Sequence, residues 1–94
     1  MSKKPRISVG HIKKLIKDGR VEFNEHGLYR SIQRNITIDQ AIYTIMNGEL
    51  IEKNENITPY PTAKFRCEID GKMLIVHITQ SRFYIVIRTV YWES

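Results

Sequence analysis

One histidine and two arginines recur at four-residue steps, as His26, Arg30 and Arg34. Residues four apart lie on the same face of an α-helix, so a helix here would carry all three side chains in one polar stripe. Arginine offers a planar fork of donors that fits a phosphate group, and an imidazole titrates near neutral pH. The stripe therefore predicts a phosphate-binding site with a group that can transfer a proton. The same spacing also fits a structural role, in which the arginines pair with carboxylates such as Asp39 or Glu49.

A second histidine, His77, lies in an apolar stretch that predicts a β-strand over Lys72–Thr79. Alternation along a strand places His77 on the same face as Ile75 and Thr79, and the more apolar residues between them on the opposite face. A lone histidine in a strand is more often a packing residue than a catalyst. The less apolar face nevertheless keeps His77 as a candidate for proton transfer.

The predicted last strand, Phe83–Trp92, offers Arg88, Thr89 and Tyr91. Arg88 interrupts an apolar run and must reach water, a carboxylate or a ligand, because an unpaired buried charge is costly. We expect Arg88 and Thr89 to contact a bound phosphate chain, with Tyr91 as an alternative to His77 in proton transfer. In the structural interpretation all three are ordinary strand residues and Tyr91 closes the core.

Basic residues concentrate at the start of the chain, where residues 1–20 hold seven of them and one acid, although the whole chain carries only +5. Lys13, Lys14 and Lys17 fall on the exposed face of a predicted helix. Such a surface attracts phosphate backbones or acidic proteins. A solvated helix face explains the same pattern, and the charges alone do not separate the two interpretations.

The sequence lacks the motifs that are typical of several classes of function. The one cysteine, Cys67, excludes an intrachain disulfide, and no cysteine pair or histidine cluster has the spacing of a metal site. No phosphate loop, dinucleotide fingerprint or nucleophile elbow is present, so we expect no small-molecule cofactor. With no secretory signal and no run long enough to cross a bilayer, we expect a cytoplasmic protein that does not contact a membrane.

The local sequence pattern changes from helical in the first half of the chain to extended in the second half. Ser8, Asn24 and Thr37 predict the starts of three helices, with Leu28 and Ile32 as the apolar edge of the second. Strands are predicted at Glu49–Asn54, Lys64–Ile69, Lys72–Thr79 and Phe83–Trp92, with a tight hairpin at Asp70-Gly71 and Val21–Phe23 as a connector. The sequence thus predicts an α+β fold, with two to three N-terminal helices packed on a four-stranded, mainly antiparallel sheet. We expect residues 8–94 to form a single domain after a flexible tail, residues 1–7.

Short motifs follow one another in a set order along the chain. They are His26-x-x-x-Arg30-x-x-x-Arg34-x-Ile36-Thr37, then Ala41-Ile42, Asn47–Glu52, Pro59-Tyr60-Pro61, Asp70–Lys72, Leu74–His77 and Thr89–Tyr91. This ordered set resembles the domain of unknown function 4258 family over roughly residues 8–92. Gly27 departs from the alanine common in that family, and Arg88 stands where many members have an apolar residue.

The resemblance implies the fold of RelE-like and barnase/EndoU-like ribonucleases, which are often grouped with toxin domains. Carried over by position, it implies that His26, Arg30, Arg34, His77 and Thr89 are recurring polar positions of the family. The function expected first is therefore a metal-independent ribonuclease of toxin type, with RNA and a cognate antitoxin as partners. The alternatives are a non-catalytic nucleic-acid-binding module and a structural or protein-interaction domain.

Overall fold

Each helix of the chain begins at the capping side chain that the sequence predicts. Ser8 accepts a hydrogen bond from the backbone of His11, and Asn24 accepts one from Gly27. Thr37 and Gln40 satisfy each other's backbone N–H groups in a capping box. These bonds replace partners that the first turn of a helix lacks, so they fix where each helix starts.

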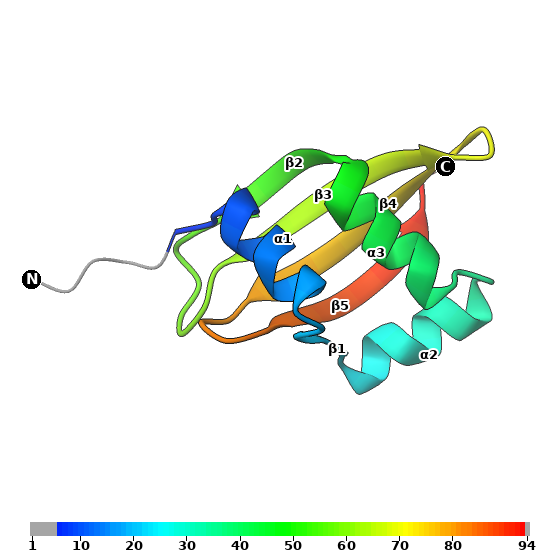
Figure 1. Cartoon of the computed structure of the whole chain (residues 1–94). Coiled ribbons are helices and arrows are strands. Elements are labelled where there is room, and N and C mark those ends of the chain that lie inside the picture. The colour runs from blue at the N-terminus through cyan, green and yellow to red at the C-terminus, as the bar shows by residue number, and fades with distance from the viewer. Residues whose placement is uncertain (1–5, 94) are drawn as a thin grey trace, which may run out of the picture.

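The computed structural model describes residues 6–93, which fold into three helices and one five-stranded sheet. In chain order the elements are α1 (Val9–Lys17), β1 (Val21–Phe23), α2 (Glu25–Gln33), α3 (Ile38–Asn47), β2 (Glu49–Asn54), β3 (Thr62–Ile69), β4 (Lys72–Gln80) and β5 (Ile85–Trp92). The sheet order is β1-β5-β4-β3-β2, and helices α1 and α3 lie across one face of it (Figure 1).

The α+β class is confirmed, but the prediction of a four-stranded sheet was wrong. Val21–Phe23, expected as a connector, forms β1 and pairs in parallel with Ile85–Ile87 of β5, so the sheet is mixed. Three residues are too few to show the alternation by which a strand is recognised. Their partner also lies near the other end of the chain, where local pattern gives no information about pairing.

The core fills the space between the sheet and the two helices that cross it. From the sheet it takes the buried side chains Leu74, Val76, Ile78, Ile85, Ile87 and Val90, and from α1 and α3 mainly Ile12, Leu15, Ala41 and Ile45. Ile75, His77 and Thr79 of β4 alternate with the core residues and point to the other side. We call that side, opposite α1 and α3, the open face.

Helix α2 does not lie across the sheet but runs beside β5, beyond the point where β1 ends (Figure 1). Its buried residues are Gly27 and Ser31, whereas Leu28 and Ile32 are 42% and 69% exposed. The prediction of Leu28 and Ile32 as the packing edge was therefore wrong. A Cβ atom on Gly27 would lie 2.7 Å from the carbonyl oxygen of Ile87, so glycine lets the helix approach the strand closely.

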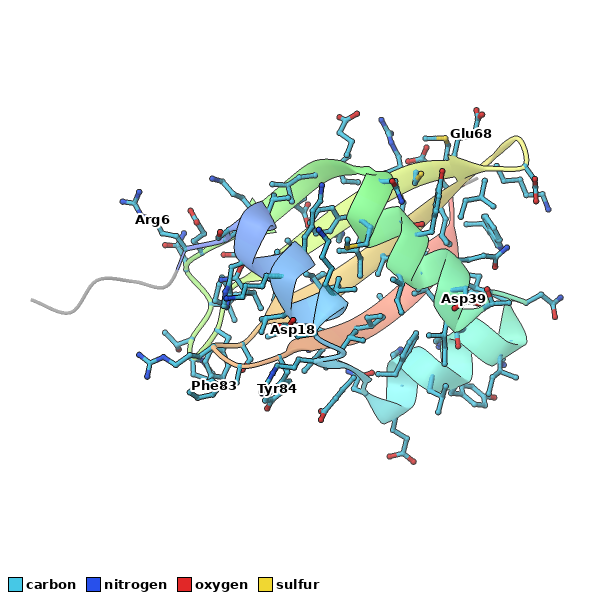
Figure 2. The ribbon with its side chains drawn as sticks, viewed as in Figure 1. Arg6, Asp18, Asp39, Glu68, Phe83 and Tyr84 are labelled. Carbon is cyan, nitrogen blue, oxygen red and sulfur yellow. The ribbon has the colours of Figure 1, made fainter. Side chains whose placement is uncertain are left out.

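The beginning of the described chain is tied to the sheet. The side-chain amide of Gln80 donates to the carbonyl of Arg6, and the backbone N–H of Ile7 donates to Glu55, both at 2.8 Å. Arg6 lies at the same end of the sheet as Phe83 and Tyr84 of the β4–β5 turn (Figure 2). Of the expected tail, residues 1–5 lie outside the described residues. Between residues 6 and 93, no helix is long and apolar enough to cross a membrane.

Candidate functional site

A row of polar side chains crosses the open face at the level of His77. His77 pairs with Lys64 of β3 on one side and with Thr89 of β5 on the other. Directly paired residues in antiparallel strands point to the same face, with Cβ atoms about 5 Å apart. The register therefore brings a histidine, a lysine and a threonine together in the middle of the sheet.

The neighbours of His77 determine its protonation. Partial burial lowers the pKa of His77 below its ordinary value of 6.5, and the cations of Lys64 and Arg88 lower it further. Glu52 opposes this shift, and its carboxylate lies 3.3 Å from the ammonium group of Lys64. His77 is consequently neutral at pH 7 and can accept a proton, in a setting where a phosphate would be attracted by two positive charges.

A β-bulge places Arg88 beside this row. Thr89 pairs with His77 but Ile87 pairs with Ile78, so Arg88 is the extra residue on β5. Its side chain is exposed and donates to the hydroxyl of Thr79 at 3.3 Å. The bulge explains how an arginine stands inside an apolar strand without burying its charge.

A hollow of about 300 Å³ adjoins Arg88 on the open face. Its walls come from the loop between β2 and β3, the last residues of β4, the first half of β5 and the N-cap of α2. The lining residues are Asn24, Ile57–Tyr60, Thr79, Val86 and Arg88. The proline-bracketed Tyr60 of the sequence motif therefore borders the same surface as His77.

The helix stripe does not converge on His77 in one hollow. His26 lines a separate hollow of about 570 Å³ with Asn24, Glu25 and Tyr29. Asn24 also lines the hollow beside Arg88, so the two hollows adjoin. His26 thus lies at the margin of the open face rather than in its polar row.

The two arginines of the stripe differ in their contacts. Arg34 donates to the carbonyl of Val90 at 2.6 Å and lies 6.0 Å from the centre of the Tyr91 ring. It thereby supplies a hydrogen-bond partner to a carbonyl of β5 that lies beyond the three residues paired with β1. Arg30 lies one turn earlier on the same side of α2, and among residues 6–93 its side chain donates only to Gln33, at 3.4 Å.

The ion pairs of the structural interpretation are not present. Within residues 6–93, no carboxylate oxygen lies within 4.0 Å of Arg30 or Arg34, so pairing with Asp39 or Glu49 is wrong. Arg34 is held instead by a backbone carbonyl and an aromatic ring. The guanidinium group of Arg30 makes one long hydrogen bond, to Gln33 of the same helix.

Lys13, Lys14 and Lys17 lie on α1, which covers the opposite face of the sheet (Figure 1). They are partly or fully exposed, so α1 does present positive charge to solvent. The layer of the sheet separates them from His77 and Arg88. The structure therefore divides the predicted RNA-binding residues between two surfaces.

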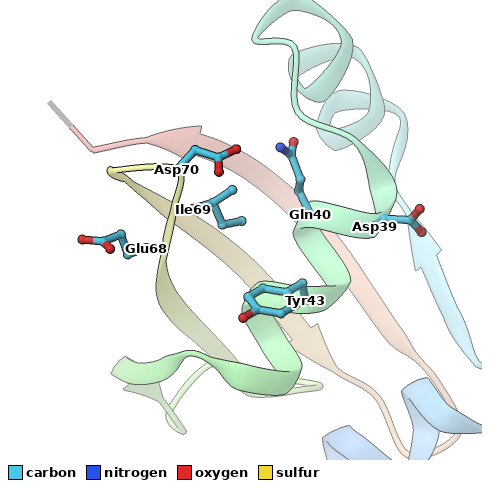
Figure 3. Close-up of a pocket in the computed structure, with 6 residues that line it drawn as sticks. All are labelled: Asp39, Gln40, Tyr43, Glu68, Ile69 and Asp70. Atoms are coloured by element: carbon cyan, nitrogen blue, oxygen red, sulfur yellow. The ribbon is translucent and has the colours of Figure 1, made fainter.

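A further hollow of about 430 Å³ lies between α3 and the β3–β4 hairpin (Figure 3). It is lined by Asp39, Gln40, Tyr43, Glu68, Ile69 and Asp70. The side chains of Asp39 and Glu68 point away from each other (Figure 3). In the described part of the chain, no three His, Cys, Asp or Glu side chains are grouped so that they could hold a metal ion.

Lys64, Thr79 and Glu52 were not predicted as site residues. Lys64 could have been found, because a two-residue Asp70-Gly71 hairpin fixes the register and pairs Lys64 with His77. The contact of Thr79 with Arg88 depends on the bulge in β5. No sequence signal indicated that bulge.

The family model for a domain of unknown function, DUF4258, matches residues 23–92, and the chain belongs to this family. The match begins at Phe23, later than the roughly residue 8 expected, so α1 precedes the matched part. It includes His26, Arg30, Arg34, His77 and the bulged strand. A comparison with curated proteins finds none that matches this chain.

Proposed function

We propose that this chain binds RNA along its open face and cleaves it without a metal ion, with His77 as the general base. The observation that carries the proposal is an imidazole with a lowered pKa between the cations Lys64 and Arg88 on an accessible sheet surface. Two cations bind a phosphate, and a neutral imidazole accepts a proton from a neighbouring hydroxyl. The proposal moves the main proton-transfer role from His26 on α2 to His77 on β4.

In the proposed reaction, His77 removes the proton of a ribose 2′-hydroxyl, and the 2′-oxygen forms a bond to the adjacent phosphorus. The bond from phosphorus to the 5′-oxygen breaks, and that oxygen takes up a proton from water on the open face. The products are a 2′,3′-cyclic phosphate and a 5′-hydroxyl. Lys64 and Arg88 stabilise the charge that develops on the phosphate oxygens in the transition state.

The resemblance of the motifs to the domain of unknown function 4258 family implies a RelE-like ribonuclease fold and so supports the same proposal. A RelE-like fold, a toxin role, a cognate antitoxin and a cytoplasmic setting all rest on that resemblance. The sheet-face chemistry rests on the positions of His77, Lys64 and Arg88 and does not depend on it. The two lines of support are therefore independent of each other.

Cleavage of a fluorescent single-stranded RNA of mixed sequence, and of ribosome-bound message, tests the proposal in the presence of EDTA. We expect the wild-type chain to release products that end in 2′,3′-cyclic phosphate. The His77→Gln variant should be slower by at least about 100-fold, which is the usual effect of losing a general base. His11→Gln serves as the matched control, because His11 lies on α1 and contacts the carbonyl of Arg82.

Equal rates for the wild type and His77→Gln would contradict the assignment of the base. Absence of cleavage of both RNAs by the folded wild-type chain would contradict the ribonuclease proposal itself. Products with a 3′-phosphate formed directly, without a cyclic intermediate, would contradict the proposed attack by the 2′-oxygen.

A further inference from the structure

A hollow of about 540 Å³ lies at the edge of the sheet beside the end of β5, where α2 ends; Tyr91 borders it from the open face and Trp92 from the side of the core. It is lined by Arg34, Thr89, Tyr91 and Trp92, and we call it the Tyr91 hollow. Its volume falls in the range of about 300–1,000 Å³ that is usual for small-molecule sites. The walls combine two aromatic rings, a planar cation and a hydroxyl, and contain no carboxylate.

The planar groups of this hollow are fixed before any ligand arrives. The Arg34 guanidinium is held by the carbonyl of Val90 at 2.6 Å and lies against the Tyr91 ring. The indole N–H of Trp92 donates to the carbonyl of Arg34 at 3.1 Å. A preorganised arginine and a half-buried aromatic ring form the kind of wall on which bases of single-stranded nucleic acid stack.

The Tyr91 hollow is continuous with the polar row around His77. Thr89 lines the hollow and is also the residue of β5 that pairs with His77. Tyr91 follows two residues later on the same strand, a step of about 7 Å along the sheet. A phosphate between Lys64 and Arg88 would therefore leave the base of a neighbouring nucleotide within reach of Tyr91.

We propose that the Tyr91 hollow is a base-stacking subsite for the nucleotide next to the phosphate at His77, an inference that rests on the proposed binding of RNA to the open face. Tyr91 and Arg34 hold the base by stacking, and Thr89 can donate to or accept from its edge. Because every base has a π-face, the subsite accepts any base. Tyr91 thereby acts in substrate positioning and not in proton transfer.

Trp92 provides a direct reporter, because it is the single tryptophan of the chain and lines the hollow. The probes are an uncleavable 2′-O-methyl RNA hexamer and a hexamer with the same phosphates but no bases. We expect the first to quench Trp92 fluorescence and to bind roughly tenfold more tightly than the second, as one stacked base contributes. Tyr91→Leu should remove that difference while leaving the affinity for the abasic probe unchanged.

Tyr43→Leu is the matched control, since Tyr43 is an exposed tyrosine on α3, on the covered side of the sheet. It should behave as the wild type with both probes. Equal binding of the two probes by the wild type, or a retained difference in Tyr91→Leu, would overturn the subsite. Base-dependent quenching by a chain that cleaves no RNA would support the subsite and contradict only the ribonuclease proposal. Cleavage of RNA without base-dependent binding would support the ribonuclease proposal and contradict the subsite.

Discussion

The environment of His77 shows how neighbouring strands determine the chemistry of one side chain. Its flanking residues in β4 are apolar, and they alone would mark it as a packing residue. The strands on either side supply Lys64 and Arg88, whose charges favour the neutral imidazole. The negative charge of Glu52, which lies 3.3 Å from the ammonium group of Lys64, acts in the opposite direction and raises the pKa of His77. The pKa of His77 is therefore lowered first by burial in the sheet and then adjusted by three charged residues that are distant from it in sequence.

Titration of the His77 ring protons by NMR tests this electrostatic account. We expect a midpoint below 6.5 in the wild type, because burial and both cations disfavour the charged imidazole. Lys64→Gln and Arg88→Gln each remove a cation and should raise the midpoint. Glu52→Gln removes the opposing anion and should lower it.

The three neutralising variants serve as controls for one another, since they change charge in opposite directions at one site. A wild-type midpoint at or above 6.5 would contradict the lowered pKa. A decrease after Lys64→Gln would mean that Lys64 acts on His77 other than by its charge.

The site residues differ in how well sequence could predict them. His77 was chosen from alternation along its strand and from its match to a polar position of the family. Lys64 could have been predicted, because the Asp70-Gly71 turn fixes the register that pairs it with His77. Arg88 was chosen as a charge in an apolar run, but its position depends on a bulge that local pattern does not reveal. Arg34 was chosen as a phosphate ligand, but it donates to the carbonyl of Val90. That carbonyl has no partner in β1, because β1 pairs with β5 only as far as Ile87.

At the scale of elements, α2 is held by small residues and not by an apolar stripe. Gly27 and Ser31 face β5, and the backbone N–H of Asn24 donates to the carbonyl of Ile87 at 3.1 Å. Beyond Phe23, where β1 ends, helix α2 lies along the edge of β5 in place of a further pairing strand. Caps and turns predicted the limits of α2, whereas its packing face could not be predicted because apolar periodicity pointed to Leu28 and Ile32.

Replacement of Gly27 by alanine tests this close packing. The new Cβ would lie 2.7 Å from the carbonyl oxygen of Ile87 and 2.9 Å from that of Arg88, so the helix must move away from β5. We expect the free energy of unfolding to fall by about 1–3 kcal/mol, as for other overpacked sites. Urea denaturation monitored by circular dichroism measures the change.

Gly10→Ala is the matched control, because Gly10 lies in α1 and a Cβ there meets no atom within 4 Å. Alanine has the higher helix propensity, so this variant should gain stability, by up to about 1 kcal/mol. Stabilisation of both variants would contradict the close approach of α2 to β5.

At the scale of the whole molecule, positive charge is divided between two surfaces. Lys13, Lys14 and Lys17 project from α1 on the covered side, and Lys64 and Arg88 project from the open face. Net charge predicts attraction to RNA but cannot tell which surface makes the contacts. The α1 surface fits a non-catalytic binding module, and the open face fits the proposed ribonuclease.

The salt dependence of RNA binding separates these two surfaces. Each phosphate neutralised by a cation contributes about −0.7 to the slope of log K against log salt concentration for a single strand. We expect the double variant Lys64→Gln/Arg88→Gln to reduce the magnitude of the slope by about 0.7, because both cations contact the same phosphate. The triple variant of the three α1 lysines to glutamine should leave the slope unchanged, because RNA bound at the open face has none of its phosphates neutralised by α1. Binding of an uncleavable 2′-O-methyl RNA, measured by anisotropy at several salt concentrations, distinguishes the variants. If the triple variant lowers the slope and the double variant does not, RNA binds to α1 and the open-face proposal is wrong.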